Sequence, residues 1–516
     1  MIITGEKAPS RLETDVCIVG SGPAGLSVAL ELERRGIHCV LLESGNREPD
    51  QAHNALNETA QTGITTDHNT VNRLRGLGGT STHWGGLVRP LDALDFERRD
   101  WVPHSGWPIS HATLAPYYAT AHRLLGFEAD QYDLAEVEGP RARSAHTLSD
   151  PDFENVAFQH DQQPIRLGQQ YFSQLADSTR ITTCLDATVT QVNTDETATR
   201  ATSLSVSTLD GRPFEVSAKR VVLAAGAIQN ARLLLNANTV APAGLGNRHG
   251  NVGRYFMQHP VLYGTRLLVW DASLRNRLRR SGVGQTAIRT AIRPEAARRH
   301  QLLNFHLFPL RPQSPGRRET LLRKLPGGFR QLLRGSQVAQ VGDVGEVPEY
   351  VEALQHLLSP GASVEPRYVP LEVRAEQVPN HASRITLGET RDALGVPQAV
   401  MDWQLTGLDQ QSLHRGLRLF GGCVARQGLG RVQAGANQLR LPEAPGQFLH
   451  GGNHHYGTTR MGESESDSVV NSDCRVHRMT NLYVAGSGVF PTTGHANPTL
   501  TVVALSARLA AHLSSP

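Results

Sequence analysis

The sequence predicts a two-domain α/β protein, and three observations support this fold class. The 516 residues exceed the size at which a single hydrophobic core keeps growing. Near the N-terminus, a buried strand, a glycine turn, a helix and a second buried strand follow one another. The pattern then changes, because longer strands with alternating polarity fill much of residues 260–450.

The N-terminal segment has the order of a Rossmann-like βαβ unit. VCIVG predicts a buried strand, LSVALELERRG a helix, and CVLLES a second buried strand. Gly20, Gly22 and Gly25 have the GxGxxG spacing of a turn that admits a pyrophosphate group. Glu43 ends the second strand, where a carboxylate can accept hydrogen bonds from ribose hydroxyls. These features predict a dinucleotide site, but they do not separate FAD from NAD.

The other elements predict how the domains are arranged along the chain. Residues 180–222 are typical of a meander of short strands, whose last member, RVVLAAG, returns to the first sheet. YVPLEVRAEQV, SRITL and AVMDWQL predict an antiparallel sheet, which a long helix follows. NLYVAG and the helix TLTVVALSARLAAHL close the chain. We therefore expect residues 1–259 and 451–516 to form a discontinuous nucleotide-binding domain, and residues 260–450 to form a substrate-binding domain.

Composition excludes several classes of protein. A net charge of +3 and a pI near 8.6 are too mild for a nucleic-acid-binding face. The five cysteines have no spacing typical of a disulfide framework or a zinc site, so we expect a reducing compartment and no metal. The N-terminus lacks a signal-peptide core, and no apolar stretch approaches about 18 residues. These features predict a cytoplasmic protein without a membrane span.

Arginines gather between Arg275 and Arg334, several of them in pairs. Such a run is typical of a solvated insertion, or of a subunit contact in a homo-oligomer. It also suits an acidic partner or an anionic substrate. The sequence leaves these interpretations open.

A glycine-rich segment, LRGLGGTSTHWGG (Leu74–Gly86), suits a loop that lies against a large planar ligand and its phosphates. With this segment the chain resembles the glucose–methanol–choline (GMC) oxidoreductase family, and STHW in particular resembles the pyranose oxidases. Further segments match in the family's order: RVVLAAGAIQNARLLL, NVGRYFMQHP, HHYGTTRMG and VAGSGVFPTTGHANPTLT. The resemblance covers nearly the whole chain.

The resemblance implies FAD as the cofactor. In pyranose oxidases the histidine of STHW carries a covalent bond to the flavin, and His83 has that place here; a hydrogen-bonded loop histidine is the alternative. Gly85 stands where glucose oxidase-like members carry asparagine, which weakens any transfer of their oxygen reactivity to this chain. The residues assigned to FAD are Gly20, Ser21, Gly22, Gly25, Glu43, Arg75, Gly79, Thr80, Ser81, His83, Trp84, Gly86, Val189, Ala225, Gly226, Ser487 and Thr499.

Alcohol oxidation requires a base that removes the hydroxyl proton as hydride leaves the carbon, and a neutral histidine suits this task at pH 7. NHHYGTTRMG offers two histidines. The family's histidine lies four residues before the threonine of GT, which selects His454, with Thr458 as that threonine. At the second catalytic position, pyranose oxidases have asparagine, and Asn497 matches it.

Asn497 also has a structural interpretation. It precedes Pro498, and this pair favours an N-cap of the closing helix. As in the family, we expect the N-terminus of this helix to point at the flavin. His495 is interpreted as a surface histidine or as a substrate contact.

The sequence thus predicts an FAD-dependent oxidoreductase that oxidises a hydroxyl of a sugar, glycoside or similar polyol. Hydride passes to flavin N5, a histidine acts as base, and oxygen, a quinone or another acceptor takes the electrons. Three alternatives remain open. They are a dehydrogenase of a non-sugar alcohol with a quinone or protein acceptor, a lyase of the same family, and a non-catalytic flavin-binding protein.

Overall fold

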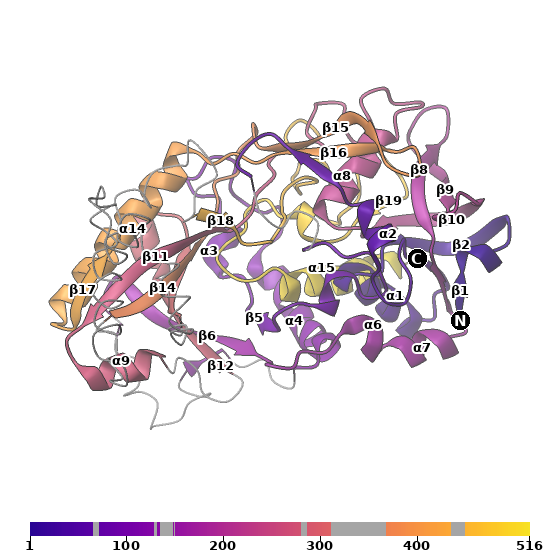
Figure 1. The fold of residues 1–516 in the computed structure, drawn as a ribbon. Helices are drawn as coiled ribbons and strands as arrows, with labels where there is room; N and C mark the ends of the chain where they lie inside the picture. Colours follow the sequence, from indigo (N-terminus) through magenta and orange to yellow (C-terminus); the bar gives the residue numbers. More distant parts are fainter. Residues whose placement is uncertain are drawn as a thin grey trace, which may run out of the picture.

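A computed structural model describes residues 1–65, 72–127, 132–134, 148, 150–279, 286–310, 368–434 and 449–515 (Figure 1). Two large sheets lie side by side, each with helices packed against it. The first sheet occupies the half of the molecule where both ends of the chain are marked, and the second occupies the other half (Figure 1). This arrangement confirms the predicted α/β fold class.

The first sheet contains the strands around the glycine turn and the meander. They are β1 (Ile2–Thr4), β2 (Arg11–Val19), β3 (Cys39–Leu42), β7 (Ile181–Leu185), β8 (Thr188–Thr194), β9 (Ala201–Ser207), β10 (Pro213–Leu223) and β19 (Leu482–Val484). Their order is β1-β7-β3-β2-β10-β9-β8, and β19 also pairs with β10. β2, β3, β10 and β19 are parallel, so the segments that follow these strands meet at one edge of the sheet.

The glycine turn joins β2 to α1 (Pro23–Arg34) through backbone that side chains would disturb. Gly20 has a φ of 100°, in the left-handed region that favours glycine. A Cβ on Gly25 would lie 1.8 Å from the carbonyl oxygen of Gly20, so helix and turn approach closely only because this residue is glycine. The predicted strand, turn and helix are all present.

Helices cover this sheet with small side chains. The C-terminal helix α15 (Thr499–Leu513) packs against α1 and against α4 (His111–Leu125). Ala504, Ala507 and Ala510 are fully buried in these contacts.

The other short helices are η1 (Gly5–Lys7), α2 (Gln51–Ala55), η2 (Gly79–Thr82), α3 (Ala93–Phe96), α6 (Leu167–Gln170), α7 (Phe172–Asp177), α8 (Ala227–Asn236), α9 (Ala272–Arg279), α10 (Pro294–His300) and η5 (Ser487–Val489).

The second sheet is antiparallel in every pairing of its described strands. Its order is β17-β11-β14-β13-β12-β6-β5, with β18 also paired to β11. The bounds are β5 (Leu87–Val88), β6 (Phe153–His160), β11 (Pro260–Val269), β12 (Thr286–Ile292), β13 (Phe305–Pro309), β14 (Tyr368–Ala375), β17 (Gly430–Gln433) and β18 (Leu449–Gly451).

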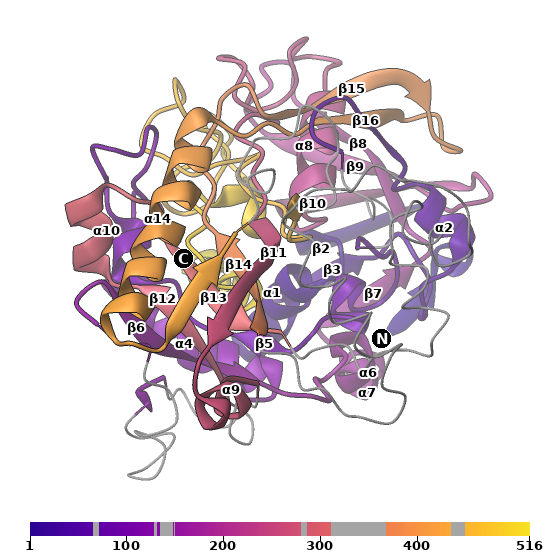
Figure 2. The same cartoon turned by 60° about the vertical axis from the view of Figure 1, so that its left-hand side comes forward.

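The two faces of the second sheet differ in polarity. Phe305, Leu307 and Val373 belong to a hydrophobic core that includes the buried side of α14 (Gly407–Arg426). His306 and Arg374 alternate with them, so they lie on the opposite face, which turns toward the first half of the molecule. Figure 2 shows α14 in front of this sheet. One face of the second sheet therefore packs into the hydrophobic core, and the other face carries polar side chains.

A small third sheet is formed by β4 (Thr59–Gln61), β15 (Arg384–Arg391) and β16 (Pro397–Asp402), and it packs on α8. The chain crosses between the two halves repeatedly. β5 and β6, from the N-terminal part of the sequence, pair in the second sheet, whereas β15 and β16 pair with β4. The domain bounds 1–259, 451–516 and 260–450 remain a prediction.

The arginine-rich stretch is only partly described. Residues 280–285 and 311–334 lie outside the described residues, so its predicted role as a subunit contact is not addressed there. Residues 286–309 form β12, α10 and β13 and therefore belong to the second sheet. Within α10, Arg298 pairs with Glu97 at 2.7 Å and Arg299 pairs with Asp152 at 2.6 Å.

Within the described ranges, no helix combines the length and apolar character needed to cross a membrane. The same part of the chain contains no group of three or more His, Cys, Asp or Glu side chains that could hold a metal ion.

Candidate active site

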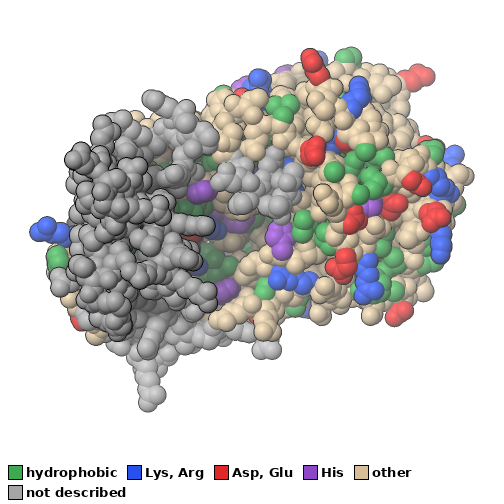
Figure 3. Space-filling view, viewed as in Figure 1, with side chains coloured by type: hydrophobic (Ala, Val, Ile, Leu, Met, Phe, Trp, Pro, Cys, Tyr) green, Lys and Arg blue, Asp and Glu red, His purple; other side chains and the backbone are tan. Residues whose placement is uncertain are grey.

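A cavity of about 520 Å³ is lined by segments from both halves of the molecule. Figure 3 shows histidine side chains gathered in the hollow between these halves. All the residues assigned to FAD or to the catalytic pair line this cavity except Ser21 and Gly25. The predicted residues that the structure brings together are Gly20, Gly22, Glu43, Arg75, Gly79, Thr80, Ser81, His83, Trp84, Gly86, Val189, Ala225, Gly226, His454, Ser487, Asn497 and Thr499.

The wall near the glycine turn fits a dinucleotide. No atom lies within 4 Å of the position that a Cβ would take on Gly22, Gly226 or Gly486, so their backbone faces open space. Gly22 is the N-cap of α1 and no side chain caps this helix, which leaves N–H groups and the positive end of the helix dipole for phosphates. A bulky phosphate group can therefore approach the backbone here.

Glu43 holds the turn together. Its Oε2 accepts hydrogen bonds from the backbone N–H of Ser21 at 3.0 Å and from the Ser21 hydroxyl at 2.6 Å. Its Oε1 accepts from the N–H groups of Gly45 at 2.9 Å and Gly76 at 3.0 Å. Four protein donors thus fix the carboxylate between two loops, a role that the sequence did not predict. Its predicted contact with ribose remains a proposal.

Arg75 is equally fixed. Its guanidinium donates to Asn57 Oδ1 at 2.9 Å and to Ser44 Oγ at 2.7 Å. Burial, followed by the nearby Arg232 cation, lowers the pKa of Arg75 to about 10, so it remains charged at pH 7. The cavity therefore has a positive wall at this end.

The STHW segment brings His83 to the cavity. Ser81 Oγ donates to the Gly78 carbonyl at 2.6 Å, and the indole N–H of Trp84 donates to the Ile165 carbonyl at 2.9 Å. The His83 ring is exposed to the cavity and makes no hydrogen bond within the described part of the chain. Burial, followed by the charge of Arg166, lowers its pKa. The ring is therefore neutral at pH 7 and free to react.

We expect FAD to be bound covalently through this free, neutral ring. Acid precipitation of the purified holoprotein should then give a yellow pellet, and the same treatment of His83→Ala should release the colour. A colourless pellet beneath a yellow supernatant from the unaltered protein would exclude the bond.

His454 comes from the C-terminal part of the sequence and lines the cavity, where a second histidine positions it. Its Nδ1 is 3.0 Å from Nδ1 of His259, which is fully buried. Nε2 of His259 is 3.3 Å from the hydroxyl of Tyr456. Burial holds the pKa of His454 well below its usual value, and the neighbouring His259 and Arg374 lower it further. The imidazole is therefore neutral at pH 7.

His455, the rival candidate, is placed differently. Its ring packs against Phe256, with ring centroids 5.6 Å apart, and its carbonyl accepts a hydrogen bond from Ser487 Oγ at 2.5 Å. Burial lowers its pKa to about 3. His455 also lines the cavity, but no described imidazole supports it as His259 supports His454.

Asn497 does not cap the closing helix, so that prediction is wrong. α15 begins at Thr499, and Pro498, with helical φ and ψ, occupies the N-cap without a side-chain hydrogen bond. Oδ1 of Asn497 is buried and has no hydrogen-bond partner among the described residues. An unpaired buried amide oxygen is costly, so this atom is available to a ligand in the cavity.

The interpretation of His495 as a surface residue is also wrong. It is fully buried beneath the second sheet. Its Nδ1 is 2.8 Å from Nδ1 of His306, and its Nε2 is 3.0 Å from Oδ2 of Asp92. Both ring nitrogens are therefore engaged by protein groups.

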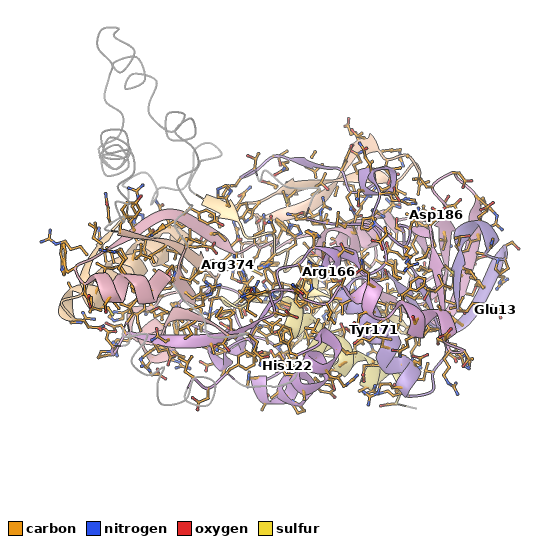
Figure 4. The ribbon with its side chains drawn as sticks, turned by 60° about the horizontal axis from the view of Figure 1, so that its bottom comes forward. Glu13, His122, Arg166, Tyr171, Asp186 and Arg374 are labelled. Carbon is orange, nitrogen blue, oxygen red and sulfur yellow. The ribbon has the colours of Figure 1, made fainter. Side chains whose placement is uncertain are left out.

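Three residues of the site were missed by sequence reasoning: His259, Arg374 and Tyr456. NVGRYFMQHP contains His259, but a single histidine carries no spacing signal that would pair it with His454. Arg374 was visible only as a polar position within an alternating strand. Figure 4 labels it between the two halves of the molecule.

Comparisons with known proteins agree with this site. A family model described as "FAD binding domain" matches residues 13–78, and one described as "GMC oxidoreductase" matches residues 379–506. The 6'''-hydroxyparomomycin C oxidase of Streptomyces lividus is 26% identical, over 97% of this chain and 92% of its own length. The C-glycoside 3-oxidase of Arthrobacter globiformis is 37% identical over a shorter stretch. That stretch covers 23% of this chain and 21% of the length of the C-glycoside 3-oxidase.

A solved structure has the same fold. The crystal structure of pyridoxine 4-oxidase from Mesorbium loti matches this fold with a TM-score of 0.61 and 15% sequence identity. The match covers 97% of this chain and 99% of the pyridoxine 4-oxidase chain. The nucleotide wall, the cavity and these matches define an FAD-dependent oxidoreductase that acts on CH–OH groups. The chain is similar to GMC oxidoreductases over residues 379–506, where that family model matches.

Proposed function

We propose that the enzyme oxidises a hydroxyl group of a sugar, glycoside or similar polyol to a carbonyl, with His454 as the catalytic base. One observation carries the proposal: a neutral imidazole held by His259 shares the cavity with the unpaired amide oxygen of Asn497. Alcohol oxidation requires a proton acceptor and a group that orients the hydroxyl, and these two side chains can supply both.

The proton moves at His454. We assign the Nδ1–H of His454 as donor to His259 Nδ1, and the Nε2–H of His259 as donor to the Tyr456 hydroxyl. This assignment leaves a lone pair on Nε2 of His454, which takes the proton of the substrate hydroxyl. His259 and Tyr456 position the base and do not touch the substrate.

Asn497 orients the substrate. Its Nδ2 can donate a hydrogen bond to the reacting oxygen, while Oδ1 accepts one from a neighbouring hydroxyl. A substrate with adjacent hydroxyls would satisfy both amide atoms, which favours a polyol over a simple alcohol. When bound, FAD accepts the hydride at N5, and the residues named here prepare the substrate for that transfer.

The lowered pKa of His454 predicts the pH dependence of flavin reduction. The base is neutral, and therefore active, above its lowered pKa, so the rate constant should stay flat from pH 8 to pH 6 and fall only at lower pH. Arg374→Gln removes a charge that lowers this pKa, so the fall should begin at higher pH. Anaerobic stopped-flow measurement across the range checks both expectations, and an unchanged profile in the variant would contradict the coupling.

The substrate class also rests on the relatives, because the C-glycoside 3-oxidase of Arthrobacter globiformis is a glycoside oxidase by name. The experiment that tests the proposed function is anaerobic mixing of the holoenzyme with free sugars, glycosides and simple alcohols. We expect polyols to bleach the flavin and simple alcohols to do so weakly. No bleaching by any sugar or glycoside would overturn the proposal. Comparing oxygen with a quinone under turnover would then identify the electron acceptor.

A further inference from the structure

Two arginines lie on the polar face of the second sheet, the face turned toward the cavity. Arg374 on β14 is directly opposite His306 on β13, and His306 is opposite Ala291 on β12. Arg289 precedes Ala291 by two positions, so it shares this face because side chains alternate along a strand. Arg374 lines the cavity itself.

Arg289 forms no ion pair with any residue that the structure describes. Its guanidinium lies 3.4 Å from the centroid of the Phe308 ring and 5.9 Å from that of Phe158. Its Nε is buried without a hydrogen-bond acceptor, and no hydrogen bond or ion pair of this side chain occurs in the described part of the chain. Burial, followed by the charge of Arg374, lowers its pKa to about 9, so Arg289 is still a cation at pH 7.

The nearby acids do not neutralise this pair. Glu372 accepts a hydrogen bond from Arg374 at 2.9 Å, and Tyr263 also bonds to it. Glu372 thus interacts with both guanidinium groups. Asp92 is already held by Arg89 and by His495, each at 3.0 Å.

Two imidazoles on this side, those of His306 and His454, add no charge. Burial holds the pKa values of His306 and His454 well below their usual value, so both rings are neutral at pH 7. Among the described residues of this face, Arg374 pairs with Glu372, whereas Arg289 forms no ion pair.

An unpaired buried cation is costly for a protein to maintain. An oxyanion would remove that cost, because guanidinium groups bind carboxylate and phosphate with two parallel hydrogen bonds. A ligand amine at the same place would meet like charge. The rings of Phe158 and Phe308 lie beside the Arg289 guanidinium, and apolar surroundings strengthen either effect.

We propose that Arg289 and Arg374 form a subsite for an oxyanion, a carboxylate or a phosphate, carried by the substrate. The inference rests on the proposed function, whose substrate class it narrows to acidic sugars or sugar phosphates. The subsite determines which substrate is bound, whereas His454 and Asn497 act on the hydroxyl.

The test compares sugars that differ mainly in charge. Calorimetry at pH 7 on the holoenzyme measures binding of glucose, glucuronate, glucose 6-phosphate and glucosamine, and anaerobic flavin reduction is followed with each. We expect at least one anionic sugar to bind about 10- to 100-fold more tightly than glucose, and glucosamine to bind most weakly. The preference should shrink as salt is added.

Matched variants locate the effect. Arg289→Met keeps an apolar stem over Phe308 and should bring the anionic sugar to within a few-fold of glucose, with glucose binding little changed. Arg374→Gln should weaken the same preference. Arg431→Gln removes an exposed cation from β17 of the same sheet and should leave the preference intact.

Equal binding of neutral and anionic sugars by the unaltered enzyme would overturn the subsite. Equal loss for all sugars in Arg289→Met, with the fold confirmed by the unfolding transition, would also overturn it, because a merely structural arginine behaves in this way. Arginine-dependent anion binding without any bleaching of the flavin would instead support the subsite and contradict the proposed oxidation.

Discussion

Replacing His454 by alanine should lower the rate constant of flavin reduction by about 10²- to 10⁴-fold, the usual contribution of a positioned general base. FAD should stay bound, because the nucleotide wall is formed by the glycine turn and the STHW segment and remains intact. Anaerobic stopped-flow spectroscopy with a substrate that bleaches the unaltered enzyme measures the change.

His455→Ala is the matched control, because the two histidines are adjacent and both line the cavity. Its effect on reduction should be much smaller than that of His454→Ala. A larger loss of rate in His455→Ala than in His454→Ala would identify His455 as the base instead. His259→Ala should reduce the rate by an intermediate factor, because His454 loses its support, and should move the low-pH fall of the rate to higher pH, because His259 lowers the pKa of His454.

Gly22→Val should give a colourless protein whose Kd for FAD is raised at least about 100-fold. The space beside Gly22 Cα is open, so the side chain will fit the protein, but it will occupy the room that the backbone offers to a phosphate. Fluorescence titration of apoprotein with FAD measures the affinity.

Gly407→Val provides the control, because Gly407 also begins a helix, faces open space and lies outside the cavity wall. Both apoproteins should unfold at nearly the same temperature, while only Gly407→Val should bind FAD normally. A Gly22→Val protein that retains flavin would contradict the assignment of the phosphate position.

The sequence was sufficient wherever a function depends on residues close together in the chain. The glycine turn, its helix and Glu43 lie within about one βαβ unit, so their spacing predicts their geometry. STHW and the C-terminal segment were found because each carries its residues in one short run. All these segments line one cavity.

Sequence reasoning failed where packing between distant parts of the chain determines the surroundings of a residue. His495 stands among small and polar residues, so nothing local shows that the second sheet covers it. In the sequence Asn497 resembles a helix cap, but Pro498 occupies that position. The amide oxygen of Asn497 therefore has no hydrogen-bond partner among the described residues. His259 meets His454 across 195 residues, and strand pairing places Arg289 on the same sheet face as Arg374. Such neighbours are set by tertiary structure alone.

The repeated crossing of the chain between its two halves has a consequence for assembly. Residues that line the cavity run from Val19 to Val502, and strands from early and late in the sequence share each large sheet. Fragments cut at residue 260 or 450 would each lack part of a sheet, so the halves cannot be expected to fold separately. Many contacts span long sequence distances, which slows folding. Flavin capture would therefore be among the last events of folding, and the appearance of bound-flavin colour during refolding would time the completion of the molecule.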